Sequence, residues 1–150
     1  MSAVPSLRFK EFKNSALKTE DLASLAAVKG LQTGPFGSQL KAEEYTDELG
    51  DIPVVMPKDI YQGKIVTDTI SKVSPKKSSQ VKKHRLKVGD VVFPRRGDLS
   101  RIAVVESGQE SWICGTGCIR FRANITLVDT GFLKPWMQQK HIGYWLLVRS

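Results

Sequence analysis

The stretch VGDVVFPRRGDLSRIAVV, residues 88–105, decides how the middle of this 150-residue chain folds. Two runs rich in β-branched residues, at 90–94 and 101–106, are separated by the short polar segment RRGDLS. Short apolar runs bounded by turn residues are typical of buried strands. The pattern therefore predicts two strands joined by a loop. That loop region holds three arginines, Arg95, Arg96 and Arg101, which a turn alone does not require.

The basic residues of the chain gather around this stretch. The net charge is +8, from 23 basic and 15 acidic residues. Residues 58–101 hold twelve of the basic residues and only four of the acidic ones, so this third of the chain carries the whole excess. Such an asymmetry favours a polyanionic partner, nucleic acid first and a membrane surface second. The alternative is a lysine-rich loop that simply faces solvent.

The flanking segments predict one α+β domain at 19–150, preceded by a polar lead-in at 1–18. A short helix is expected from Thr19, which can act as N-cap, to Gly30, which can end it. Strands are expected at 52–56 and after a turn at Gly63, and residues 74–90 are expected to form a long basic connection. Residues 131–150 are expected to be helical. Together these elements predict a curled, mixed or antiparallel β-sheet with a short N-terminal helix and a C-terminal helical segment.

The segment WICGTGCIRFR, residues 112–122, supplies three further expectations. Cys114 and Cys118 lack metal-ligand spacing, so we expect two small buried thiols that stay reduced. The intervening Gly-Thr-Gly is expected to form a tight turn or a close approach of two backbones. From residue 118 onward the sequence alternates, which places Ile119 and Phe121 on one face of a strand and the arginines between and after them on the other.

Signatures of catalysis are largely missing from the sequence. Ser38 and Lys87 could be nominated as a hydrolase dyad, but only their residue types support the idea. The Arg-Gly-Asp tripeptide at 96–98 is expected to be a chance occurrence, because no secretion signal or disulfide framework accompanies it. No apolar run approaches the roughly 20 residues of a membrane span, and the N-terminus lacks an apolar signal core. We therefore expect a non-catalytic cytoplasmic protein without a bound cofactor, metal or membrane partner.

Nucleic-acid binding needs two kinds of side chain, and both are present. Lysines on loops neutralise phosphates, as the 76–85 stretch could do. Arginine forks and amide groups reach base edges, a role open to Arg95, Arg96, Arg101 and Gln39. The alternative for Arg96 and Arg101 is an ion pair with Asp98 or Asp90.

The ordered set of segments GPFGSQLKAEEY, GDIPVVMPKDIYQGKI, HRLKVGDVVFPRRGDLSRIAVV, WICGTGCIRFR and FLKPWM, between about residues 17 and 140, resembles a target recognition domain of type I restriction–modification specificity subunits. The opening VPSLRFKEF also looks like the start of such a subunit. The resemblance implies a mixed sheet whose loops enter the major groove and read one half of a split DNA target. It also implies partner methylation subunits that bind S-adenosylmethionine, and a restriction subunit that uses ATP.

The chain departs from the family pattern because it shows one recognition domain and no long spacer helix. A second hypothesis is therefore a protein–protein interaction module that binds or inhibits a methylation subunit. A DNA-recognition module remains the first hypothesis. The residues expected to contact DNA are Ser38, Gln39, Lys58, Lys76, Lys77, Lys82, Lys83, Arg95, Arg96 and Arg101.

Overall fold

The computed structural model describes residues 26–97 and 101–126 of the chain. The predicted lead-in, the first part of the predicted N-terminal helix, the centre of the Arg95–Arg101 loop and the C-terminal helical segment lie outside these ranges. Within them, none of the helices is long or apolar enough to cross a membrane.

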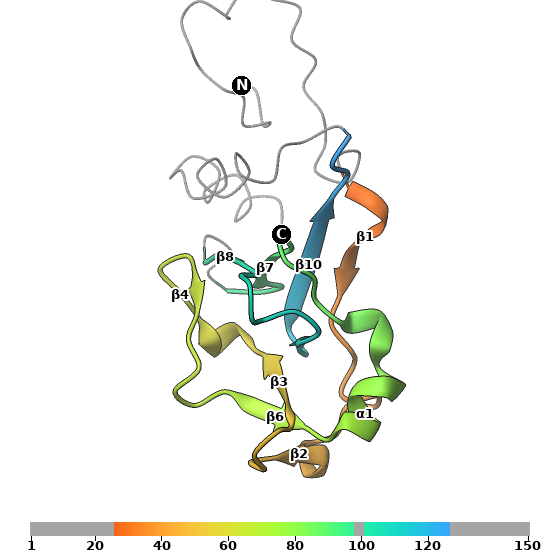
Figure 1. Cartoon of the computed structure of the whole chain (residues 1–150), viewed down its shortest axis with the longest axis vertical. Helices are drawn as coiled ribbons and strands as arrows, with labels where there is room; N and C mark the ends of the chain where they lie inside the picture. Colours follow the sequence, from red (N-terminus) through yellow and green to blue (C-terminus); the bar gives the residue numbers. More distant parts are fainter. Residues whose placement is uncertain (1–25, 98–100, 127–150) are drawn as a thin grey trace, which may run out of the picture.

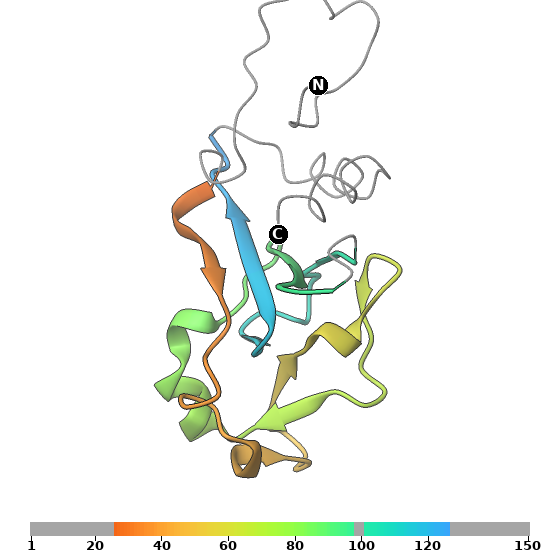
Figure 2. The same ribbon diagram turned by 180° about the vertical axis from the view of Figure 1, so that it is seen from behind.

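Two four-stranded sheets and a small hairpin form the described part of the fold (Figures 1 and 2). The first sheet is antiparallel and has the order β1-β10-β7-β8. Its strands are β1 (Ala26–Thr33), β7 (Val91–Pro94), β8 (Ala103–Val104) and β10 (Cys118–Ala123). The second sheet has the order β2-β6-β3-β9 and is mixed, because β3 and β9 run parallel. Its strands are β2 (Tyr45–Thr46), β3 (Ile52–Val55), β6 (Ser71–Val73) and β9 (Ile113–Cys114).

The remaining elements are short. A hairpin pairs β4 (Ile60–Tyr61) with β5 (Lys64–Ile65). The helical elements are α1 (Pro75–Gln80) and three single 3-10 turns, η3 (Ala42–Glu44), η4 (Pro57–Asp59) and η5 (Lys82–His84). The predicted fold class, an α+β domain built on curled sheets, is confirmed.

The strand pair predicted around the Arg95–Arg101 loop is confirmed. Strands β7 and β8 are antiparallel, with Val91 opposite Val104 and Val92 opposite Ala103. Strand β7 lies between β10 and β8, and all four of its residues are buried, so the side chains on both of its faces are covered. This explains why its sequence is continuously apolar rather than alternating.

The predicted helix at 19–30 is wrong in the part that the structure describes. Residues 26–33 form β1, which pairs with β10 through Leu31–Phe121 and Thr33–Ile119. Val28, in this strand, is 94% exposed. Gly30 does not end a helix. A glycine is needed there because the backbone packs closely, and a Cβ would meet the carbonyl oxygens of Arg122 and Ala27. Pairing with a strand some 90 residues away outweighs the weak local helix propensity of this segment.

The predicted long loop at 74–90 is also corrected. Residues 75–80 form α1, and the side chain of its N-cap, Ser74, accepts a hydrogen bond from Lys77 N at 3.2 Å. Pro75 occupies the first helical position, where its fixed φ suits a helix start. The Ser-Pro start signal was visible in the sequence but was outweighed by the charge of the segment.

The expectations for residues 112–122 are confirmed. Cys114 and Cys118 are free and buried, and burial raises the pKa of Cys114 to about 12 and also raises that of Cys118. The Gly-Thr-Gly segment is a turn closed by Cys118 N donating to Gly115 O at 3.1 Å. Its backbone approaches Gly34 closely, because a Cβ on Gly34 would lie against the Gly115 carbonyl.

Candidate nucleic-acid interface

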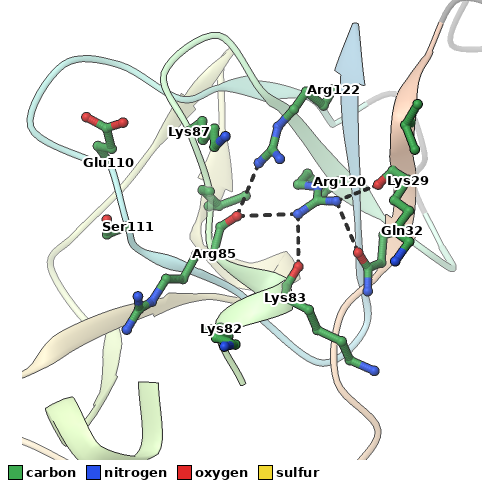
Figure 3. A pocket seen from close by; sticks show the side chains of 12 residues that line it. Lys29, Gln32, Lys82, Lys83, Arg85, Lys87, Glu110, Ser111, Arg120 and Arg122 are labelled. Atoms are coloured by element: carbon green, nitrogen blue, oxygen red, sulfur yellow. Dashed lines mark hydrogen bonds between the residues drawn. The ribbon is translucent and has the colours of Figure 1, made fainter. Parts of the chain in front are cut away.

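A pocket of about 500 Å³ opens between β1, η5 and β10, and basic side chains dominate its lining (Figure 3). Seven of the twelve lining residues are lysines or arginines, and only one is acidic. Three of the basic residues come from around η5, two from β10 and one from β1, and Lys87 follows η5. The basic residues are Lys29, Lys82, Lys83, Arg85, Lys87, Arg120 and Arg122, and the acid is Glu110.

Arg120 is the fixed centre of this pocket. It points from β10 between η5 and β1, and it is only 3% exposed. Its Nη1 donates to Lys83 O at 3.0 Å and, more weakly, to Arg85 O at 3.4 Å. Its Nη2 donates to Lys29 O at 2.7 Å and to Gln32 Oε1 at 3.1 Å. Burial lowers the pKa of Arg120, but an arginine remains charged at neutral pH.

Arg122, two residues along the same face of β10, is held by a buried carboxylate. Its Nε and Nη2 each donate at 2.8 Å to a different oxygen of Asp90, which is a bidentate ion pair. Nη2 also reaches Arg85 O at 3.3 Å, so both guanidinium groups meet at one carbonyl. Asp90 also accepts from Lys87 N at 2.8 Å, which anchors the segment after η5. The two arginines therefore form a wall whose geometry is set by the fold.

The lysines of the pocket are exposed and surround this wall. Lys29, Lys82, Lys83 and Lys87 all present exposed side chains, and none takes part in an ion pair among the described residues. Arg85 is tied only loosely, by contacts of 3.3 and 3.5 Å to the hydroxyl oxygens of Ser78 and Ser79. Four adaptable cations over two fixed ones form a surface suited to phosphates.

His84, in η5 beside the pocket, is a neutral part of the core. It is 4% exposed, and neither ring nitrogen meets hydrogen-bond geometry with a partner within the described ranges. Burial and the nearby charges of Lys83 and Arg120 lower its pKa to about 4, although the backbone of Thr33 opposes the shift. His84 therefore buries its ring within the fold without adding charge at neutral pH.

This burial predicts a loss of stability in acid that depends on His84. The unfolded chain takes up a proton at His84 near pH 6.5, whereas the folded chain resists protonation down to about pH 4. The stability contributed by the neutral ring is complete above pH 6.5 and falls as the pH drops toward 4, by an amount on the order of 3 kcal/mol. Urea unfolding at pH 7 and at pH 4.5 should show a smaller drop for His84→Met than for the unaltered chain. Equal drops would contradict this assignment.

The structure separates the ten residues predicted to contact DNA into two groups. The first group lies on or near α1 and η5, and we call this the pocket side because residues of η5 line the pocket. Lys82 and Lys83 line the pocket itself. The turn that carries Ser38 and Gln39 lies near the end of α1, because the adjacent Leu40 shares a core cluster with Val81, but neither residue lines the pocket. The members of this group are Ser38, Gln39, Lys76, Lys77, Lys82 and Lys83.

Two members of this group already have partners. Lys77 pairs with Glu44 at 2.8 Å and is largely covered, and this contact lowers the pKa of Glu44. Gln39 Oε1 accepts from Phe36 N at 3.3 Å, which closes the turn. Ser38 and Lys76 are exposed.

The second group, Lys58, Arg95, Arg96 and Arg101, belongs to the β4–β8 side. In both views β4 and β8 lie on the side of the molecule opposite α1 (Figures 1 and 2). Arg101 donates to the carbonyl oxygen of Ile60 from Nε, at 2.9 Å, and from Nη2. Lys58 Nζ contacts Asp59 Oδ1 at 2.9 Å and Thr69 O at 2.6 Å. Both side chains thus brace turns.

The ion pair with Asp90 that the sequence allowed for Arg96 or Arg101 does not form. Asp90, one suggested partner of Arg96 and Arg101, pairs with Arg122 instead. Asp98 lies outside the described residues. Arg95 is half-buried and Arg96 is exposed, at the end of β7.

Sequence reasoning missed four members of the basic site, which are Lys29, Lys87, Arg120 and Arg122. The alternation along 118–122 did place both arginines on one face, and their shared contact with Arg85 O confirms it. The signal that could have found them is an apolar strand whose second face repeats arginine. No pattern in the sequence links Lys29 to this site, since its segment was predicted to be a helix and not a strand beside β10.

No cluster of three or more His, Cys, Asp or Glu side chains within residues 26–97 and 101–126 could hold a metal ion. No protein-family model matches the sequence, and a search of curated proteins finds no significant match.

Proposed function

We propose that this chain is a non-catalytic module that recognises duplex DNA, with the pocket side facing the sugar–phosphate backbone. The observation that carries the proposal is the ratio of seven cations to one acid around a single pocket, with four exposed lysines at its edge. A nucleic-acid backbone is the polyanion that such a surface suits best, because its phosphates are regularly spaced and can meet several cations together.

The two kinds of cation suit two parts of this task. The exposed lysines lose little by reorienting toward phosphates, and each releases a condensed counterion from the duplex. Arg120 donates only to neutral carbonyl and amide oxygens, so it contributes positive potential at a fixed position, whereas the charge of Arg122 is balanced by Asp90. Together they would set the register of the module on DNA without reading sequence.

Base reading would need side chains that project from the module toward a groove. Gln39 is the one predicted reader near α1, and its amide nitrogen has no acceptor among the described residues while its oxygen is held by Phe36 N. Arg95 and Arg96 belong to the other side, so we assign them no part in the phosphate contacts of the pocket.

The family resemblance narrows the proposal to the target recognition domain of a type I specificity subunit, working in the cytoplasm. The α+β fold with a curled mixed sheet is compatible with it. Under this proposal, methylation subunits that use S-adenosylmethionine and a restriction subunit that uses ATP are protein partners, and this chain itself binds neither cofactor.

The proposal predicts a steep dependence of DNA affinity on salt. If the four exposed pocket lysines each neutralise one phosphate, raising monovalent salt from about 50 to about 200 mM should weaken duplex binding roughly 100-fold. Fluorescence anisotropy with a labelled duplex over this range measures the slope. A slope near zero would contradict a phosphate interface.

Selection of bound sequences from a random duplex pool tests the recognition step itself. We expect enrichment of a short base motif by the full chain. If no duplex is retained, but the chain binds a methylation subunit without DNA, the interaction-module hypothesis replaces this one.

A further inference from the structure

We infer that the pocket between β1, η5 and β10 is a discrete receptor for phosphoryl groups, able to bind a small linear oligophosphate in the absence of DNA. This inference depends on the residues that line the pocket, and it does not require that the natural partner be DNA. If the proposed function also holds, the pocket is the site that binds a phosphate of the DNA backbone.

Rigid walls distinguish this pocket from an ordinary patch of surface lysines. Arg120 is fixed by three backbone carbonyls and one side-chain amide, and Arg122 by both oxygens of Asp90. Neither arginine has to be ordered when an anion arrives, so binding avoids much of the usual entropy cost. Arg122 Nη1 has no acceptor among the described residues, which leaves a fixed donor at the pocket wall.

The size and charge of the pocket favour a ligand with several negative charges. Its volume of about 500 Å³ falls in the range of small-molecule sites, roughly 300–1,000 Å³. Arg122 is balanced by Asp90, and the six other cations against Glu110 still exceed what one phosphate would balance. Glu110 and Ser111 lie together at one edge of the pocket, away from Arg120 and Lys83 (Figure 3). The cationic part is therefore continuous, which suits a chain of phosphoryl groups.

Two sources could supply such groups, a free oligophosphate or the backbone of a nucleic acid. Both present tetrahedral oxyanions to the same donors, so the chemistry of the pocket does not distinguish them. Tripolyphosphate serves as the probe for the first source and a blunt duplex as the probe for the second.

Calorimetric titration of the full chain with tripolyphosphate, at ionic strength held constant with sodium chloride, tests the inference. We expect saturable binding that Lys82→Ala/Lys83→Ala weakens about tenfold, since two exposed cation contacts are lost. The matched control is Lys64→Ala/Lys72→Ala, which removes the same charge outside the pocket and should leave affinity within about twofold. In a proton–nitrogen NMR spectrum, the Nε resonances of Arg120 and Arg122 should shift on binding while that of Arg101 stays in place.

The arms of this experiment separate the two proposals. Tripolyphosphate binding that depends on the pocket lysines, with no duplex binding, supports the receptor and overturns the DNA function. Displacement of bound duplex by tripolyphosphate supports both. Duplex binding without tripolyphosphate binding, or tripolyphosphate binding that the two double variants weaken equally, overturns the receptor.

Discussion

Replacing Arg120 with methionine is expected to destabilise the fold by about 3–5 kcal/mol, because the change removes one group from a buried polar cluster and leaves its partners unpaired. The guanidinium joins β10 to β1 through Lys29 O and to η5 through Lys83 O. Methionine can fill the space, but it donates no hydrogen bonds. The carbonyls at 29 and 83 would then lose this donor, and β10 would lose its side-chain link to both segments.

Equilibrium unfolding in urea measures this loss, and Arg85→Met provides the control. Arg85 lines the same pocket but is half-buried and makes only long side-chain contacts, so its replacement should cost less than about 1 kcal/mol. Arg120→Lys should fall between the two, since an ammonium cannot reach all four acceptors. A loss below about 1 kcal/mol for Arg120→Met would show that Arg120 is not the centre of the pocket.

Gly34→Ala is expected to be nearly as damaging, at about 3 kcal/mol or more, because the added methyl group has no room. A Cβ at this position would press on the Gly115 carbonyl oxygen and lie 2.6 Å from the carbonyl carbon. Backbone atoms cannot rotate away as a side chain can. Gly34 N also donates to Cys118 O at 2.9 Å, so a shift of Gly34 would break the link to β10.

The same loop contains a matched control for this change. A Cβ on Gly37 would meet nothing within 4 Å, and Gly37 is exposed. Thermal unfolding should therefore show a large drop in midpoint for Gly34→Ala and almost none for Gly37→Ala. Equal midpoints would contradict the close approach of the two backbones.

The sequence predicted those parts of the fold whose signals are local. The apolar run at 90–94 became β7, and the Gly-Thr-Gly turn and both buried cysteines were foreseen. The edge strand β1 could not be predicted from local sequence, because it depends on pairing with β10, which is remote in the sequence. The short α1 was not predicted although Ser74 and Pro75 are typical of a helix start, because the many lysines of the segment favoured a solvent-exposed loop.

The candidate site was predictable only in part. Lys82 and Lys83 were named from their density in the sequence, and they do line the pocket. The pocket needs three segments that are remote in sequence, around residues 29, 85 and 121, and no spacing rule links them. Arg101 illustrates the same limit, because its acceptor, Ile60 O, lies 41 residues away.

The most direct test of the DNA interface compares the duplex affinity of two double variants with equal loss of charge. At constant salt near 150 mM, Lys82→Ala/Lys83→Ala should weaken duplex binding about 20-fold and reduce the salt slope by about two. Lys64→Ala/Lys72→Ala, which changes lysines outside the pocket, should leave both quantities nearly unaltered. If the two variants lose affinity equally, binding follows net charge alone, and the pocket is not the interface.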